Sequence, residues 1–212
     1  MSTIVQKYGG SSLADAEKVR GVARRVIDAK VKGLNVVVVC SAMGESTDEL
    51  LALSKQVASL PTEREVDLLL STGEMVSCAL LAMALNDMNC PAVSLTGLQA
   101  GIQTEALHGK ARIAGVAPDR IIAELEAGKV VVVCGFQGVT EAQEVTTLGR
   151  GGSDTTAVAL AAAIMAERCE IYTDVEGIYT ADPRIVPQAR KLSEIGYEEM
   201  LELAMTGAKM QP

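Results

Sequence analysis

The sequence predicts a three-layer α/β/α sandwich with a mostly parallel central sheet. Strand-like apolar runs alternate with helical patterns along the chain, which is the arrangement typical of a parallel α/β fold. Two runs of four valines, at 36–39 and 130–133, contain no polar residue. Because a half-exposed strand would alternate polar and apolar residues, both faces of these strands should be covered, as in the centre of a parallel sheet.

Each element follows from a local pattern. The helix expected over 14–31 has Val19, Val22 and Val26 at helical spacing. The helix over 118–127 lies between Pro118, which favours a helix start, and Gly128, which favours a stop. The sequence also predicts strands at 3–6, 35–40, 92–95, 130–134 and 170–173. Further helices are expected at 63–86, 154–167 and 194–205.

Composition and charge exclude several classes of function. The 212 residues suit one domain with a large aliphatic core. A net charge of −8 argues against nucleic-acid binding, which requires a basic surface. The five cysteines form no CxxC pair and fit reduced core residues of a cytosolic protein, and the single histidine argues against a zinc site or a histidine-dependent triad. The N-terminus lacks a signal peptide pattern and no run has membrane-spanning length, so we expect a cytoplasmic, soluble protein.

The first of three chemically informative segments is KYGGSS at residues 7–12. Lys7 follows a buried strand, so its amine should emerge at the edge of the sheet. Gly9 and Gly10 allow close approach of the backbone to a ligand, and a helix starting near Ser12 would direct free N–H groups to the same point. The segment predicts a phosphate-binding loop, although it is not a Walker A motif. The alternative is a tight strand–helix turn with a surface lysine.

The second segment is GRGGSD at residues 149–154. Its three glycines leave the backbone free to wrap around an anion, and the planar guanidinium of Arg150 matches a carboxylate. Ser153 or Asp154 could cap the following helix. A flexible loop with an ordinary cap would explain Ser153 and Asp154, but it would not explain three glycines around an arginine.

The third segment is TDVEGIYTADPR at residues 173–184. Thr173 and Asp174 should end a strand, Gly177 should turn a short hairpin, and Asp182-Pro183 should fix a second turn. Tyr179 could lie against a nucleotide base and Arg184 could reach its phosphates. A plain surface hairpin is the alternative.

Two smaller segments add hydroxyl and carboxylate groups. CSAMGEST at 40–47 ends the first valine run and contains Ser41 and Thr47. STGE at 71–74 puts Glu74 at the start of a long apolar helical stretch, where the helix dipole alone would favour a glutamate.

These segments resemble the signatures of one enzyme family. KYGGSS is similar to the KFGGTS signature of aspartate kinases, with Tyr8 and Ser11 in place of Phe and Thr, and GRGGSD and TDVEGIYTADPR are similar to the second and third signatures. The similarity runs from residue 3 to about residue 209. The chain therefore resembles the catalytic domain of an aspartokinase, a member of the amino-acid kinase superfamily with its carbamate kinase-like fold.

The resemblance implies a role for individual residues. Lys7 would be a catalytic, phosphate-binding lysine, and Asp154 would organise the catalytic lysines. Arg150 would bind the α-carboxylate of aspartate and Glu74 its amino group. The implied nucleotide-binding positions are Lys7, Gly9, Gly10, Ser41, Thr173, Asp174, Tyr179, Asp182, Arg184 and Lys209. The implied substrate-binding positions are Thr47, Glu74, Arg150, Gly151, Gly152 and Ser153.

The resemblance also implies phosphorylation of L-aspartate by ATP, as the first step toward lysine, threonine and methionine. The acceptor carboxylate is ionised at neutral pH, since its reference pKa is about 3.9, so no general base is needed. Mg²⁺ would be carried with ATP, and no residue is expected to form a separate metal site. A dimer or an assembly with a regulatory subunit is implied.

Some alternatives stay open. The acceptor could be acetylglutamate, glutamate or a nucleoside monophosphate, or the protein could bind nucleotide without catalysis. Residues 1–212 would form one kinase domain, shortened at its C-terminal end, because family members continue past LELAMTGAKMQP and add regulatory ACT domains.

Overall fold

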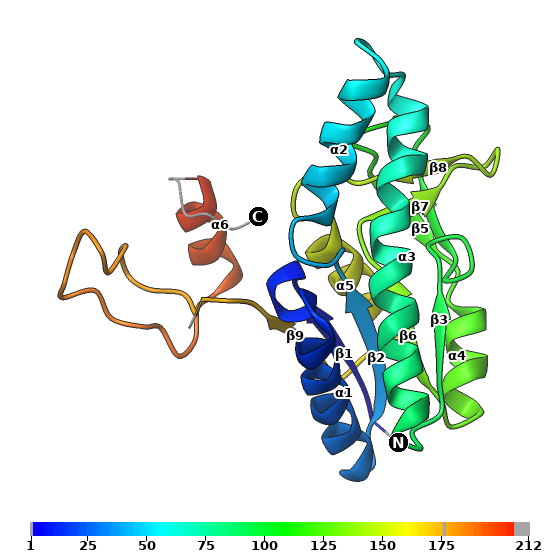
Figure 1. Ribbon diagram of the computed structural model, residues 1–212. Helices are drawn as coiled ribbons and strands as arrows, with labels where there is room; N and C mark the ends of the chain where they lie inside the picture. The colour runs from blue at the N-terminus through cyan, green and yellow to red at the C-terminus, as the bar shows by residue number, and fades with distance from the viewer. Residues whose placement is uncertain (1, 176, 206–212) are drawn as a thin grey trace. The chain divides into compact units, whose positions relative to one another are not determined.

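The computed structural model describes residues 2–175 and 177–205 (Figure 1). The chain divides into two compact units, one ending at Thr173 and the other beginning at Asp174. The first unit contains all the strands named below, and the second contains the helix α6 (Tyr197–Met205).

A parallel sheet of five strands forms the centre of the first unit. The strands are β1 (Thr3–Tyr8), β2 (Asn35–Cys40), β3 (Ala92–Leu95), β6 (Val130–Cys134) and β9 (Arg168–Tyr172). Their order is β3-β6-β2-β1-β9, and every neighbouring pair is parallel. The predicted fold class is confirmed, and three of the five expected strands have the bounds that the sequence predicted.

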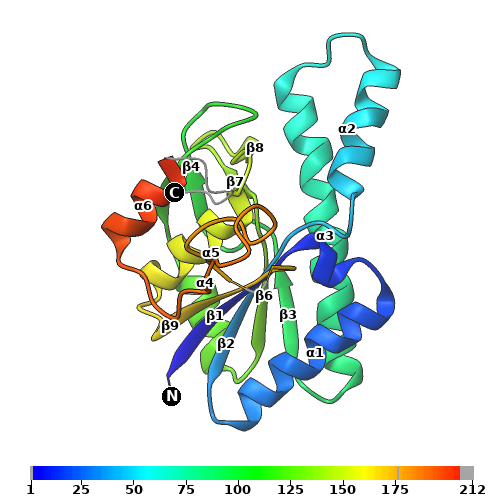
Figure 2. The same cartoon turned by 90° about the vertical axis from the view of Figure 1, so that its left-hand side faces the viewer.

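Helices cover both faces of this sheet (Figure 2). The long helices α1 (Ala16–Val31) and α3 (Glu63–Asp87) pack on one face, and α4 (Asp119–Glu126) and α5 (Gly152–Ala163) pack on the other. The valine runs alternate between the two cores. Val36, Val38, Val130 and Val132 face α1 and α3, whereas Val37, Val39, Val131 and Val133 face α4 and α5. All eight valines are fully buried, as two-sided coverage of these strands requires.

A second, smaller sheet was not predicted. It contains β5 (Ile113–Val116), β4 (Ile102–Thr104), β7 (Gln137–Val139) and β8 (Val145–Thr147) in the order β5-β4-β7-β8. Three of its strands, β4, β7 and β8, contain only three residues, which is too few to show a period in the sequence. The helix α2 (Ser46–Val57) was also missed, because its sequence mixes polar and apolar residues with only one buried side chain, Ser54.

The start of α1 differs from the prediction. The residues after the first glycine pair form a single 3₁₀ turn, Gly10–Leu13, and α1 begins only at Ala16. The side chain of Asp15 accepts a hydrogen bond from Lys18 N at 2.9 Å and so caps this helix. The expectation that a helix near Ser12 offers free N–H groups was therefore wrong.

The end of α5 also differs. It ends at Ala163 rather than 167, because Met165 has a φ of 50° and Ala166 N donates to Ala161 O at 2.8 Å. This Schellman-type turn stops the helix before β9.

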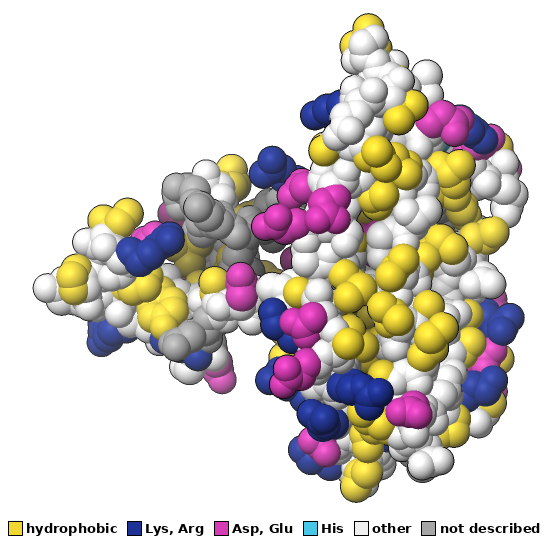
Figure 3. Space-filling view, viewed as in Figure 1, with side chains coloured by type: hydrophobic (Ala, Val, Ile, Leu, Met, Phe, Trp, Pro, Cys, Tyr) yellow, Lys and Arg dark blue, Asp and Glu magenta, His cyan; other side chains and the backbone are white. Residues whose placement is uncertain are grey.

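The 25-residue helix α3 is, among the described residues, the one helix long and apolar enough to span a membrane by length and composition. Half of its most apolar window is buried within the fold, as expected for a core helix. The opposite side of α3 exposes Leu68, Met75, Val76 and Met83, and Figure 3 shows hydrophobic side chains gathered over this helix. The burial of one side accounts for only part of the apolar composition.

Candidate active site

The carboxyl end of the parallel sheet carries an ion pair between two predicted catalytic residues. Lys7, the penultimate residue of β1, is almost fully buried, and its Nζ lies 2.8 Å from Oδ1 of Asp154 in the first turn of α5. The contact is an ion pair. Oδ1 is buried and has no hydrogen-bond partner among the described residues. A mostly buried ammonium next to a half-buried carboxylate is a fixed positive group whose position is set by α5.

The loop after β1 packs closely against the loop after β2. Gly10 O accepts from Gly44 N at 3.0 Å, and Ser41 N donates to Tyr8 O at 3.1 Å. On the other side of β1, Gly9 N donates to Tyr172 O at 3.4 Å. A Cβ added to Gly9 would lie 3.6 Å from Nζ of Lys7. The main chain at Gly9 thus borders the lysine ammonium, as a phosphate-binding loop requires.

Replacement of Gly10 by alanine should destabilise the protein. The added Cβ would lie 2.8 Å from Ala42 O and 2.9 Å from Gly44 O, and both are backbone atoms. We expect Gly10→Ala to lower the free energy of unfolding by about 1–3 kcal/mol. Gly21→Ala is the control, since a Cβ at this position in α1 meets nothing within 4 Å, and it should stabilise by about 0.5–1 kcal/mol. Urea unfolding of the two variants measures both; a Gly10→Ala midpoint at or above that of wild type would contradict the close approach.

Glu74 lies on the buried side of α3 beside the end of β2. Its side chain is 2% exposed, and Oε1 accepts a hydrogen bond from Ala42 N at 3.1 Å. Oε2 is buried and has no hydrogen-bond partner among the described residues. Glu74 is in the middle of α3 rather than at its start, so the helix dipole does not account for it. A buried carboxylate oxygen without a donor is costly unless a ligand supplies one.

The stability of the protein should fall as Glu74 ionises. Burial raises the pKa of Glu74 from its ordinary value of 4.5 to about 7, against the opposing hydrogen bond from Ala42. Because the folded-state pKa is the higher one, the stabilising contribution is complete below about pH 4.5 and is lost as the pH rises through 7. From about pH 5 to pH 8, wild type should lose up to about 3 kcal/mol relative to Glu74→Gln. Chemical unfolding of both proteins across this range tests it, and parallel stability curves would contradict it.

The segment 149–154 forms a tight loop that leads into α5. Gly149 and Gly151 have φ values of 78° and 71°, in the left-handed region that favours glycine. Gly152 is needed for packing, because a Cβ there would lie 2.9 Å from Leu148 Cβ and 2.9 Å from Phe136 Cδ2. Each glycine therefore has a structural cause. The capping prediction was wrong: the cap position is Gly151, without a side-chain hydrogen bond, and Ser153 and Asp154 lie inside the first turn.

Two side chains of this loop have contrasting environments. Ser153 is buried, and a Cβ at Gly135 would come within 2.8 Å of its Oγ. Arg150 is exposed and has no ion pair with any residue that the structure describes. The loop thus presents an available guanidinium four residues before the carboxylate that binds Lys7.

The structure brings most of the predicted residues of the first unit to one end of the sheet. Ser41 follows β2, Thr47 is the second residue of α2, and Thr173 follows β9. Sequence reasoning missed Gly135, which directly follows β6 and lies against Ser153. A glycine immediately after a buried valine strand was the available signal.

The residues predicted from the third segment lie mainly in the second unit, whose position relative to the first is not determined. Within that unit, Tyr179 and Lys191 form an antiparallel β-bridge. This pairing lies further along the chain than the short hairpin that was expected around Gly177. Arg184 donates to Asp182 from Nε at 3.0 Å and from Nη2 at 2.8 Å. Asp174 also belongs to this unit, and Lys209 lies outside the described residues.

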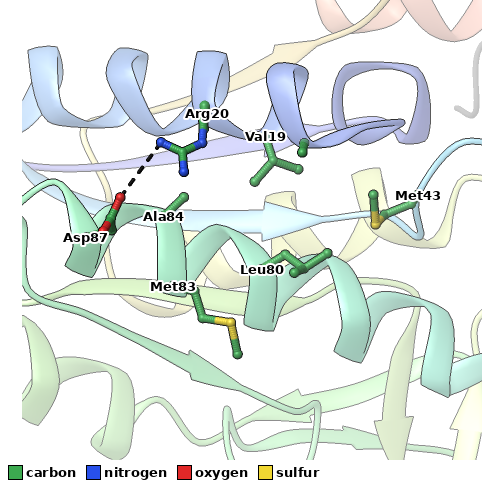
Figure 4. Close-up of a pocket in the computed structure, with 8 residues that line it drawn as sticks. Val19, Arg20, Met43, Leu80, Met83, Ala84 and Asp87 are labelled. Atoms are coloured by element: carbon green, nitrogen blue, oxygen red, sulfur yellow. Dashed lines mark ion pairs between the residues drawn. The ribbon is translucent and has the colours of Figure 1, made fainter.

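A separate hollow lies between two helices of the first unit. A groove of about 490 Å³ between α1 and α3 is lined mainly by apolar side chains such as Val19, Leu80 and Met83 (Figure 4). Its charged groups, Arg20 and Asp87, pair with each other at 3.7 Å. Because it offers no glycine loop and no available cation for a phosphate, we assign the chemistry to the sheet end and not to this groove.

Comparison with known proteins identifies relatives of the chain. An aspartokinase of Geobacillus stearothermophilus is 61% identical over 98% of this chain, and the chain covers 51% of that protein. The crystal structure of aspartate kinase from Synechocystis superimposes with a TM-score of 0.84 at 53% identity, over 97% of this chain and 34% of that one. E. coli aspartokinase III in complex with aspartate and ADP gives a TM-score of 0.86 at 28% identity, over 96% and 56% of the two chains.

These relatives confirm the resemblance to aspartate kinases, and the chain spans about half the length of the curated relatives it matches. The model of the amino acid kinase family matches residues 2–210. The parallel sheet, the glycine loops at its carboxyl end and this match over nearly all of the sequence lead to one assignment: the chain belongs to the amino acid kinase family.

Proposed function

We propose that this protein is an aspartate kinase, which transfers the γ-phosphoryl group of ATP to the side-chain carboxylate of L-aspartate. The products are ADP and 4-phospho-L-aspartate. The relatives named above support this proposal, and one of the similar structures is described as a complex with aspartate and ADP. The observation that carries it is the buried Lys7–Asp154 pair at the carboxyl end of β1, next to a loop with an available arginine.

The aspartate site would combine two charged groups. The unpartnered Oε2 of Glu74 suits the ammonium group of an amino acid, and the guanidinium of Arg150 suits its α-carboxylate. The main chain at Gly151 and Gly152 and the side chains of Ser153 and Thr47 would complete this site. Two charges at fixed separation would orient the side-chain carboxylate of aspartate toward Lys7.

The nucleotide site would use the loops that follow β1, β2 and β9. Lys7, Gly9, Gly10 and Ser41 would bind the phosphates. The remaining contacts are proposed for Thr173, Asp174, Tyr179, Asp182, Arg184 and Lys209. We propose that Mg²⁺ is held mainly by the phosphates of ATP, where it would neutralise their charge.

The chemical step needs positioning rather than a base. An oxygen of the ionised aspartate carboxylate would form a bond to the γ-phosphorus, while the bond from that phosphorus to the bridging oxygen of ADP breaks. No proton needs to move, because the acceptor is already a carboxylate. Lys7 would stabilise the charge on the transferring group, and Asp154 would hold the ammonium in place.

We further propose that the reaction is the first step toward lysine, threonine and methionine and takes place in the cytoplasm. We propose that the protein works as a dimer or in an assembly with a regulatory subunit. We also propose that residues 1–212 form one kinase domain.

The proposal is tested by measuring ADP release by the purified chain with ATP, Mg²⁺ and one acceptor at a time. Aspartate should support turnover, whereas acetylglutamate, glutamate and nucleoside monophosphates should not. Trapping the acyl phosphate with hydroxylamine would identify the product as an aspartyl hydroxamate. Turnover with another acceptor, or ATP binding without turnover, would refute the proposed activity.

A further inference from the structure

The single histidine of the chain belongs to a buried hydrogen-bond cluster outside the site described above. The cluster centres on Asp67, which lies on α3 and is fully buried. Asp67 precedes Glu74 by seven residues, or about two helical turns, so both carboxylates lie on the same side of α3. No function was predicted for Asp67 from the sequence, and the proposed chemistry does not use it.

Asp67 holds two separate chain segments. Gly109 N donates to its Oδ1 and Oδ2 at 3.1 and 3.0 Å, and Nδ1 of His108 lies 2.8 Å from Oδ2. From the end of β8, Thr147 Oγ1 donates to Oδ1 at 2.5 Å. Because a carboxylate can only accept hydrogen bonds, the Nδ1 of His108 carries the proton. Three neighbouring groups thus donate hydrogen bonds to the buried carboxylate of Asp67.

The loop held by Asp67 lies against the segment that carries Arg150. Ala111 N donates to Thr147 O at 2.9 Å, which joins the loop to β8. A Cβ added to Gly149 would lie 3.6 Å from Gly109 O and 3.7 Å from Lys110 Cα. The main chain directly before Arg150 therefore rests on the main chain that Asp67 anchors.

The other side of this segment is also fixed. Leu148 N donates to Phe136 O at 2.9 Å, and Gly152 packs on the Phe136 ring. The peptide of Arg150 therefore emerges between the end of β6 and the 105–112 loop. The guanidinium itself has no ion pair within the described ranges, so its position depends on this backbone.

We infer that Asp67 and His108 are positioning residues that fix the backbone of Arg150 and thereby set the affinity for the carboxylate-bearing substrate. The inference rests on the proposed function for its substrate, although the anchoring itself does not. The chemical class of the affected ligand is an α-amino acid, because Arg150 would bind an α-carboxylate.

The test compares His108→Ala, which removes the ring, with His108→Asn, whose amide N–H can replace Nδ1–H. His108 is suited to this because its side chain is 24% exposed, so its removal should leave the fold intact. His108→Ala should raise the KM for aspartate about ten-fold, as expected for weakening a hydrogen bond to a charged group. The KM for ATP and kcat should stay within about two-fold, and His108→Asn should restore most of the affinity. Glu124→Gln is the control, a carboxylate of α4 paired with Arg120 and Lys129, and it should leave both KM values unchanged.

Amide hydrogen exchange of the ligand-free variants gives an independent measurement. Peptides covering 105–112 and 147–151 should exchange faster in His108→Ala than in wild type, with no change in α4. An unchanged exchange rate, an unchanged aspartate KM, or an equal loss in kcat and both KM values would overturn the inference. If wild type lacked activity, the proposed function would fail, and hydrogen exchange alone would decide whether Asp67 and His108 anchor the loop.

Discussion

Replacement of Lys7 by alanine should lower kcat by about 10²–10³, with only a small change in the KM for aspartate. Lys7 is the buried cation at the carboxyl end of β1, and its ammonium is fixed by Asp154 at 2.8 Å. Its charge would stabilise the transferring phosphoryl group, whose negative charge is redistributed in the transition state. The loss of one preorganised electrostatic donor typically has an effect of this size. Steady-state kinetics with aspartate and ATP varied separately measures it.

The control for this variant is Lys18→Ala, which removes an exposed lysine of α1 that lies 4.0 Å from Asp15. It should have wild-type kinetics. Because Lys7→Ala also leaves Asp154 without its ion pair, the thermal unfolding midpoint of both variants should be recorded. Near-wild-type turnover in a folded Lys7→Ala protein would refute the catalytic role of Lys7.

Replacement of Arg150 by alanine should raise the KM for aspartate by about 10- to 100-fold and leave the KM for ATP nearly unchanged. Loss of a hydrogen bond between charged groups has a cost in this range. The fold should be unaffected, within about 0.5 kcal/mol, because the exposed guanidinium has no ion pair among residues 2–175 and 177–205.

Arg150→Lys distinguishes charge from geometry. A lysine keeps the positive charge but lacks the planar fork that binds a carboxylate through two N–H groups. The KM for aspartate should therefore lie between those of wild type and Arg150→Ala. If Arg150→Ala had an unchanged aspartate dependence, Arg150 would be a structural residue of the loop.

The central sheet could be predicted because its signal is local. Four consecutive valines in β2 and in β6 require coverage of both faces, and the structure buries alternate valines in two different cores. The glycines at 9, 10, 149 and 151 could be connected with ligand loops because they cluster beside Lys7 and Arg150. The individual causes at Gly10, Gly149 and Gly151, a contact below 3 Å or a positive φ, become visible only in the folded chain.

The rest of the site depends on contacts that no local pattern records. The sequence suggested a role for Glu74 through family resemblance. The hydrogen bond from Ala42 N to Oε1 and the buried, unpartnered Oε2 could be recognised only in the folded structure. Asp67 appears as an ordinary polar residue in a helix, and its partners come 41, 42 and 80 residues later. The three-residue strands of the second sheet were missed for a different reason, since three residues carry no period.

The most direct test of the account is a crystal structure of the protein with ADP and L-aspartate bound. The account predicts that the nucleotide phosphates lie at the carboxyl ends of β1 and β2, in contact with Nζ of Lys7, and that the guanidinium of Arg150 binds the α-carboxylate of an aspartate in the same pocket. It would be contradicted if Lys7 and Arg150 faced separate surfaces, or if the ligands occupied the apolar groove between α1 and α3 instead.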